Sequence, residues 1–236
     1  MRVSTICVLT VLMVSFTSSE IPSQLLDYPQ SLERELATLL EAQAQRFSDH
    51  TLLLKLADLY LDIGNDLFTD PKQRLVAYKE GARFAQRALE LQEDSAEAHF
   101  LYAANLGEAA ALKGVVQSFL SVNKIRFHVM RALELKKDHV PALHMAGMML
   151  EELPRLMGGN PEAALDYVKR AVTLNPTYTE ARLNLAKMYL KRNTPDLAKQ
   201  ELLAITNMDH PNDPYAWVQH HRPEAVRILD SLRHTK

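Results

Sequence analysis

One short motif recurs along this chain and decides what it can fold into. Arg87-Ala-Leu-Glu-Leu91 returns as Arg131-Ala-Leu-Glu-Leu135 and, with two changes, as Arg170-Ala-Val-Thr-Leu174. The small residue of each copy recurs at spacings of 44, 39 and 34 residues, at Ala88, Ala132, Ala171 and, as a larger equivalent, Ile205. Two helices can approach closely where a small residue lies opposite a bulky one, so the pattern predicts stacked helix hairpins.

The last and most regular copies, between residues 159 and 192, resemble a tetratricopeptide repeat. Its second-helix half is matched by Ala164, Val168, Ala171 and Pro176, and the first half of the next unit by Leu185, Ala186 and Tyr189. The 34-residue spacing is the period of that repeat. The resemblance implies an all-α, TPR-like α-solenoid of about four helix hairpins over residues 50–210. A linker and N-terminal capping helix over 20–49 and a C-terminal capping helix over 211–236 would close the stack.

The two longer spacings predict insertions within hairpins. The larger one falls between Leu106 and Ile125, where an apolar stretch runs over residues 109–120. Longer hairpin helices are the simplest interpretation. The same stretch could instead enclose a small hydrophobic ligand or form a contact between copies of the chain. Asp70-Pro71, Asn160-Pro161 and Thr194-Pro195 each indicate a helix start, with an N-cap residue followed by proline in the first turn.

The composition excludes some classes of function. Only seven glycines in 236 residues favour helix throughout. Lysine and arginine (27) nearly balance aspartate and glutamate (29), which argues against a nucleic-acid partner, because such proteins normally carry a basic stripe.

The N-terminus differs from the rest. Arg2, the apolar run Val3 to Phe16 and the small residues Thr17-Ser-Ser19 have the order of a secretory signal peptide over residues 1–19. We therefore expect a periplasmic or secreted protein with no stable membrane insertion after cleavage; a retained N-terminal anchor is the alternative. Cys7, the single cysteine, lies inside this segment, so the mature chain would have no disulfide.

A more specific resemblance covers about residues 95–232. Its residues are His99-Phe-Leu-Tyr-Ala-Ala-Asn-Leu-Gly107, Leu112-Lys-Gly114, Asn123-Lys-Ile-Arg-Phe-His128, Arg131-Ala-Leu-Glu-Leu135 and Ala146-Gly-Met148. Together they look like the regulator-of-microtubule-dynamics family and its bacterial relatives. In architecture, the export signal with four repeats is also similar to the T-component of TRAP transporters. That likeness implies a helper protein that associates with a solute-binding partner.

The sequence carries no pattern typical of catalysis. His139 and His144 are five residues apart and do not share a helix face as a metal-binding pair would. No phosphate-binding glycine loop or nucleophile motif is present, and Gly158-Gly159 is an isolated pair. We expect no enzyme activity, no cofactor and no metal.

Binding is expected in the concave groove that first helices of tetratricopeptide hairpins line. The repeat alignment assigns to it Asp58, Phe100, His144, Met148, Asn184 and Lys187. Phe100, His144 and Met148 would anchor a partner, and Asn184 and Lys187 would make polar contacts. The family's clamp for C-terminal carboxylates uses lysine and asparagine early in the groove, where this chain has Leu54 and Asp58, which disfavours a chaperone tail.

These features predict an exported, noncatalytic scaffold. It would bind a protein or peptide partner in its groove and help to assemble an envelope or transport complex. The alternative is a carrier of a small hydrophobic ligand, or a transporter accessory protein, that uses the apolar segment 109–120. Homo-oligomerisation through that segment is a further possibility.

Overall fold

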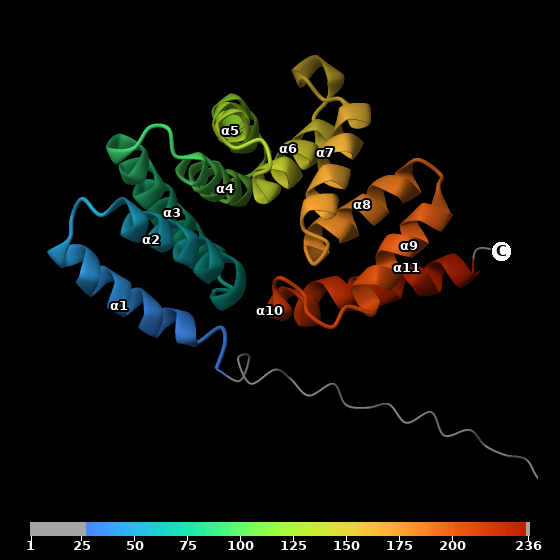
Figure 1. Ribbon diagram of the computed structural model, residues 1–236, viewed down its shortest axis with the longest axis horizontal. Coiled ribbons are helices and arrows are strands. Elements are labelled where there is room, and N and C mark those ends of the chain that lie inside the picture. Colours follow the sequence, from blue (N-terminus) through green and yellow to red (C-terminus); the bar gives the residue numbers. More distant parts are fainter. Residues whose placement is uncertain (1–26, 235–236) are drawn as a thin grey trace, which may run out of the picture.

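The computed structural model describes residues 27–234, and within them the chain is helical with short connections (Figure 1). Four antiparallel hairpins follow one another: α2 (His50–Asp62) with α3 (Pro71–Leu91), α4 (Ala96–Leu112) with α5 (Val115–Leu135), α6 (Val140–Glu152) with α7 (Pro161–Leu174), and α8 (Thr179–Lys191) with α9 (Pro195–Thr206). The predicted all-α solenoid of four hairpins is thus confirmed.

Further helices cover the two ends of the stack. Helix α1 (Ser31–Gln45) packs on α2, and α11 (Arg222–His234) packs on α9. Short turns lie between: a π-helical segment at Ile63–Leu67, a 3-10 turn at Arg155–Met157, α10 at Pro214–Ala216 and a second π-helical segment at Trp217–His221. None of the helices in the described part of the chain is both long and apolar enough to cross a bilayer. The predicted signal segment 1–19 lies outside the described residues.

The helix starts follow the N-cap pattern of the sequence. The side chains of Asp70, Ser95 and Asn160 each accept a hydrogen bond from a backbone N–H of the first turn. Such bonds satisfy donors that the helix itself leaves without a partner. Thr194 occupies the N-cap position of α9, but its hydroxyl donates to the carbonyl of Tyr189 instead.

The small residues of the repeat lie at the closest helix contacts. Ala88, Ala132, Ala171 and Ile205 are completely buried. Gly147 of α6 faces α7 so tightly that a Cβ at this position would come within 2.5 Å of a Val168 methyl carbon. The core is therefore formed by close helix approach, as the repeat motif predicts.

The first insertion lengthens the hairpin of α4 and α5, which confirms the simplest interpretation of it. The two helices contain 17 and 21 residues and are joined at Gly114, whose φ of +93° is a conformation that side chains with a Cβ rarely adopt. The apolar residues that follow Gly114 lie on the outer side of this hairpin, away from the core.

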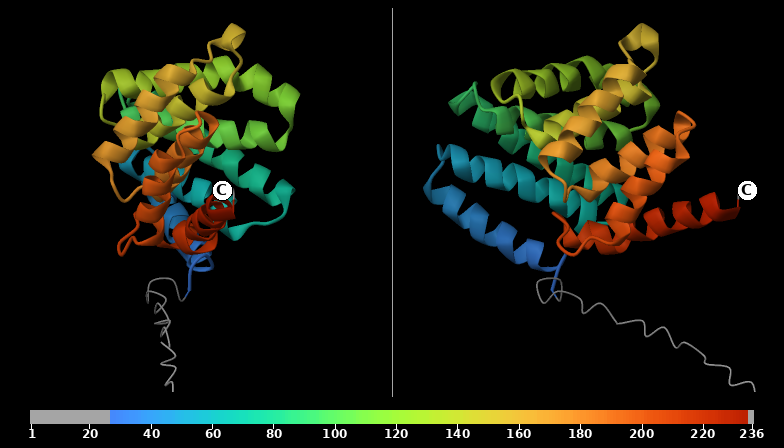
Figure 2. Two further views of the ribbon diagram at one scale, coloured as in Figure 1. Left: turned by 90° about the vertical axis from the view of Figure 1, so that its right-hand side faces the viewer. Right: turned by 45° about the vertical axis from the view of Figure 1, so that its right-hand side comes forward.

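The solenoid curves until its two ends meet (Figures 1 and 2). The rings of Tyr28, before α1, and Tyr215, in α10, are in edge contact with centroids 4.8 Å apart. The Tyr28 hydroxyl also donates to a carboxylate oxygen of Asp66 in the first π-helical segment. The C-terminal segment thereby closes one side of the concave surface.

Candidate functional site: the concave groove

The concave surface is lined by the first helix of each hairpin, as the repeat alignment expected. Two adjoining cavities of about 290 and 300 Å³ form one continuous groove along α2, α4, α6 and α8. Both cavities are lined by Leu61, Phe100, Pro141, Tyr178 and Glu180. The groove is large enough for several side chains of a peptide.

One end of the groove is strongly acidic. Asp58 and Asp62 of α2 face Asp213 and His221 across it. Burial, together with the charges of Glu97 and Glu35, raises the pKa of Asp58. Burial and the neighbouring acidic groups, Asp58 foremost, raise the pKa of Asp62 to about 8. These carboxylates repel one another and lose solvation, so a bound cation would stabilise their ionised form.

The middle of the groove contains a chain of hydrogen bonds that fixes Tyr178. Burial lowers the pKa of His144, which keeps its ring neutral. The Asn184 amide lies 2.9 Å from His144 Nε2, and His144 Nδ1 lies 3.1 Å from the Tyr178 hydroxyl. The hydroxyl in turn donates to Glu180 at 3.3 Å. Because the Asn184 N–H donates to Nε2, Nδ1 carries the proton and donates to Tyr178, so every bond in the chain has a defined direction.

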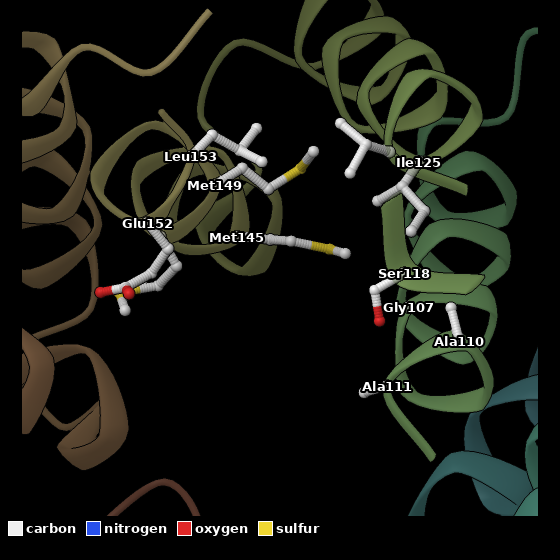
Figure 3. Close-up of a pocket in the computed structure, with 11 residues that line it drawn as sticks. Gly107, Ala110, Ala111, Ser118, Ile125, Met145, Met149, Glu152 and Leu153 are labelled. Atoms are coloured by element: carbon white, nitrogen blue, oxygen red, sulfur yellow. The ribbon is translucent and has the colours of Figure 1, made fainter. Parts of the chain in front are cut away.

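The other end of the groove opens into an apolar cleft of about 410 Å³ between the α4–α5 hairpin and α6. Met145 and Met149 point into it from α6, opposite Ile125, Ala110 and Ala111 (Figure 3). Met148 lines both this cleft and the middle of the groove. Methionine side chains adapt to ligands of irregular shape, so this end suits apolar groups.

Four of the six predicted site residues come together in the groove. Asp58 lies at its acidic end, Phe100 and His144 in its middle and Met148 at the entrance to the cleft. His144 is largely buried, and its ring hydrogen-bonds to the Tyr178 hydroxyl in the groove. Asn184 does not line the groove itself but hydrogen-bonds to His144, which does.

Lys187, the sixth, extends toward α11, where its ammonium group lies 3.7 Å from Glu224. Its role as a polar contact stays a prediction.

Sequence reasoning missed much of the acidic character of the groove. Asp62 follows Asp58 by one helical turn, and Glu108 follows Ala104 in the same way, so extending each helix face would have found both. Glu180 precedes Asn184 by one turn of α8 and follows in the same way, whereas Tyr178 and Asp213 lie just before α8 and α10, outside the helix faces, and gave no such signal. The curvature of the solenoid brings them opposite α2.

Comparison with known proteins agrees with this architecture. The family model described as regulator of microtubule dynamics protein 1-3 matches residues 20–152, which is more than half of the chain. The chain belongs to this family. A tetratricopeptide-repeat model matches residues 155–218, so the two models together cover most of the solenoid.

Curated members of the family match over most of this chain. Regulator of microtubule dynamics protein 1 of Mus musculus is 29 % identical over 219 residues, covering 86 % of this chain and 71 % of the mouse protein. The protein of the same name from Pongo abelii is 28 % identical over 219 residues, covering 86 % of this chain and 69 % of its own length.

The crystal structure of a thermophilic TPR protein of Thermus thermophilus is similar in fold. It superposes with a TM-score of 0.63 at 14 % identity, over 84 % of this chain and 92 % of that one. The resemblances to tetratricopeptide proteins and to the microtubule-dynamics regulators are therefore confirmed. The likeness to the TRAP transporter component stays a prediction.

Proposed function

We propose that this family member is a noncatalytic scaffold that holds a basic, partly apolar segment of a partner protein in its concave groove. The tetratricopeptide fold supports a protein-binding scaffold, and the pairing of acidic and apolar groups along one groove supports this kind of segment. The observation that carries the proposal is the pair of crowded carboxyl groups of Asp58 and Asp62, which line the groove together with the partly buried Phe100. A lysine or arginine there would stabilise their ionised forms, which burial and mutual repulsion disfavour.

The partner segment would lie along the groove from end to end. Its cationic side chains would pair with Asp58, Asp62 and Glu180, and its apolar side chains would pack on Phe100 and Met148. The curated relatives are named as regulators of microtubule dynamics. If this chain had a similar role, the acidic groove would still favour a basic partner over an acidic one.

Export is a separate part of the proposal and rests on the sequence of residues 1–19. If the segment is cleaved, the scaffold would act in the periplasm or outside the cell and help to assemble an envelope or transport complex. Mass spectrometry of the native protein tests this directly. A mature chain that begins near Glu20 is expected, and a full-length chain with cytoplasmic partners would overturn it.

A matched pair of peptides tests groove binding. Both carry the same apolar residues, and the positions between them are lysine in one and glutamate in the other. Calorimetry is expected to detect binding of the lysine peptide alone, with loss of binding in the Phe100→Ala, Met148→Ala double variant. Val76→Ala with Leu203→Ala, two exposed apolar residues outside the groove, is the control and should bind normally. Equal binding of both peptides, or full binding by the groove variant, would refute the proposal.

A small apolar ligand is a second candidate function, favoured by the methionine-lined cleft (Figure 3). Gly107 offers a way to fill that cleft, because a Cβ there would meet Met145 only at an ordinary contact distance of 3.5 Å. Native mass spectrometry is expected to find a co-purifying apolar molecule in the wild type but not in Gly107→Leu. Absence of any such molecule from the wild type would remove this candidate.

A further inference from the structure

The outer face of α5 has a composition unlike that of the rest of the chain. From Ala109 to Leu133 there is no aspartate or glutamate, although the chain contains 29 of them in 236 residues. The same 25 residues include Lys113, Lys124, Arg126 and Arg131. A nearly neutral protein thus carries one acid-free, basic segment, most of which is α5, the hairpin helix that lies away from the acidic groove.

The outer face of α5 is also apolar. Val115, Val116, Phe119 and Leu120 are 86, 75, 58 and 68 % exposed, and Phe127 and Met130 further along the helix are exposed as well. At 100° per residue these six side chains lie within an arc of about 140° on one side of the helix. With 21 residues, α5 is about 31 Å long, so the stripe is far larger than an isolated exposed side chain.

Cations border this stripe. Lys113 is exposed beside its N-terminal end, and Lys124 lies along one edge with its ammonium group 4.9 Å from the centre of the Tyr102 ring. Arg126 lies on the other edge and donates to the carbonyl of Met157 in the next hairpin loop. Leu156, in that loop, is fully exposed. Arg131 pairs with Glu134 at 3.0 Å, where the acid-free stretch ends.

We propose that the outer face of α5 docks on an anionic lipid surface, lying in the plane of the interface without crossing it. Apolar side chains flanked by lysine and arginine are what such a surface binds, because the rings and methyl groups enter the acyl boundary while the cations meet acidic headgroups. Docking in this way turns the acidic groove away from the lipid. The groove stays open to a partner while the solenoid is held at the surface.

Charge argues against a second copy in a symmetric pair as the occupant. Two α5 faces against each other would bring the Lys113 and Lys124 side chains of both copies together without an acidic group between residues 109 and 133 to compensate them. A head-to-tail contact, in which α5 of one copy meets the acidic groove of another, is the competing arrangement, and the test below separates it from lipid binding.

Co-sedimentation with vesicles tests the proposal on the full chain. Vesicles of phosphatidylcholine mixed with phosphatidylserine are compared with vesicles of phosphatidylcholine alone, at low and high salt. We expect binding to the anionic vesicles that weakens with salt. Phe119→Ser with Leu120→Ser should weaken it roughly tenfold or more, because two side chains no longer enter the interface. Lys113→Glu should weaken it to a smaller degree.

The control is Val76→Ser with Leu91→Ser, which removes two exposed apolar residues from α3 on the same convex side. It should bind as the wild type does. Comparing variants of the full chain cancels any contribution of residues 1–26 to vesicle binding. Equal binding by the α5 and α3 variants, or equal binding to neutral and anionic vesicles, would overturn the proposal. Absence of vesicle binding combined with concentration-dependent self-association in ultracentrifugation would overturn it in favour of the head-to-tail contact.

Discussion

The concave groove and the outer face of α5 are built from the same helix hairpins but have opposite chemistry. In the groove, α2 and α4 present Asp58, Asp62 and Phe100. On the convex side, α5 presents a stripe of valine, phenylalanine and leucine bordered by cations. Each hairpin contributes its first helix to the groove and its second helix to the convex side. Helix α5 also lines the apolar cleft through Ser118, Val122 and Ile125, but these residues differ from those of its exposed stripe, so substitutions in the stripe leave the cleft lining unchanged. Under the two proposals above, this separation gives one small protein two distinct binding surfaces.

Disrupting the helix packing that supports both surfaces should have the largest effect on stability. In Gly147→Val, the added side chain meets Val168 at the crowded contact of α6 with α7, and overpacking of this kind costs about 3 kcal/mol of unfolding free energy. Chemical denaturation measures the loss. Since both surfaces depend on this stacking, peptide and vesicle binding should weaken together on heating. Unchanged stability would mean that the hairpins pack less closely than described.

Removing the groove charges should separate the two surfaces. Asp58→Asn with Asp62→Asn is expected to weaken binding of the lysine peptide about tenfold, or about 1.4 kcal/mol, because the paired carboxylates are lost. Vesicle binding should not change. The variant also removes two carboxyl groups whose ionised forms are disfavoured by burial, so we expect no loss of stability that could explain weaker binding. A parallel loss of vesicle binding would show that the surfaces are not independent.

The pH dependence of stability tests the crowding of the carboxylates. Asp62 holds its proton in the folded protein up to a pH of about 8, whereas in the unfolded chain it releases it near the ordinary value of 3.8. Stability should therefore fall as pH rises between these two values. Asp62→Asn should reduce this fall in unfolding free energy by about 1 kcal/mol. The reduction is modest because water at the groove screens much of the electrostatic effect. Thermal melts across this range measure it, and parallel profiles for the two proteins would contradict the shifted pKa.

Lys187 should give the smallest effect. Its side chain is 45 % exposed and pairs with Glu224 at a distance of 3.7 Å, a kind of ion pair that contributes roughly 0.5 kcal/mol or less. Lys187→Ala is expected to leave stability and binding of the lysine peptide almost unchanged. A large loss of peptide affinity would restore Lys187 as a direct contact in the groove.

The fold was predictable from sequence because close helix packing restricts residue choice at particular positions. Ala88, Ala132 and Ala171 all mark contacts where a larger side chain would push two helices apart. The lining of the groove was predictable in part. The helical period places Asp58, Phe100 and Met148 on the inner face of the first helix of their hairpins. Tyr178 and Asp213 did not follow, because the curvature that carries them across to α2 is the sum of many small rotations between repeats. No local pattern records that sum.

Hydrogen exchange on one sample of the full chain tests the two-surface account most directly. The exchange rates of the amides are measured with the lysine peptide, with anionic vesicles and with both together. The account predicts that the peptide slows exchange in α2, α4 and α6, that vesicles slow it along α5 and in the adjoining turn, and that both effects occur together in the mixture. If peptide and vesicles slow exchange in the same helices, or if one displaces the other, the two surfaces are not separate.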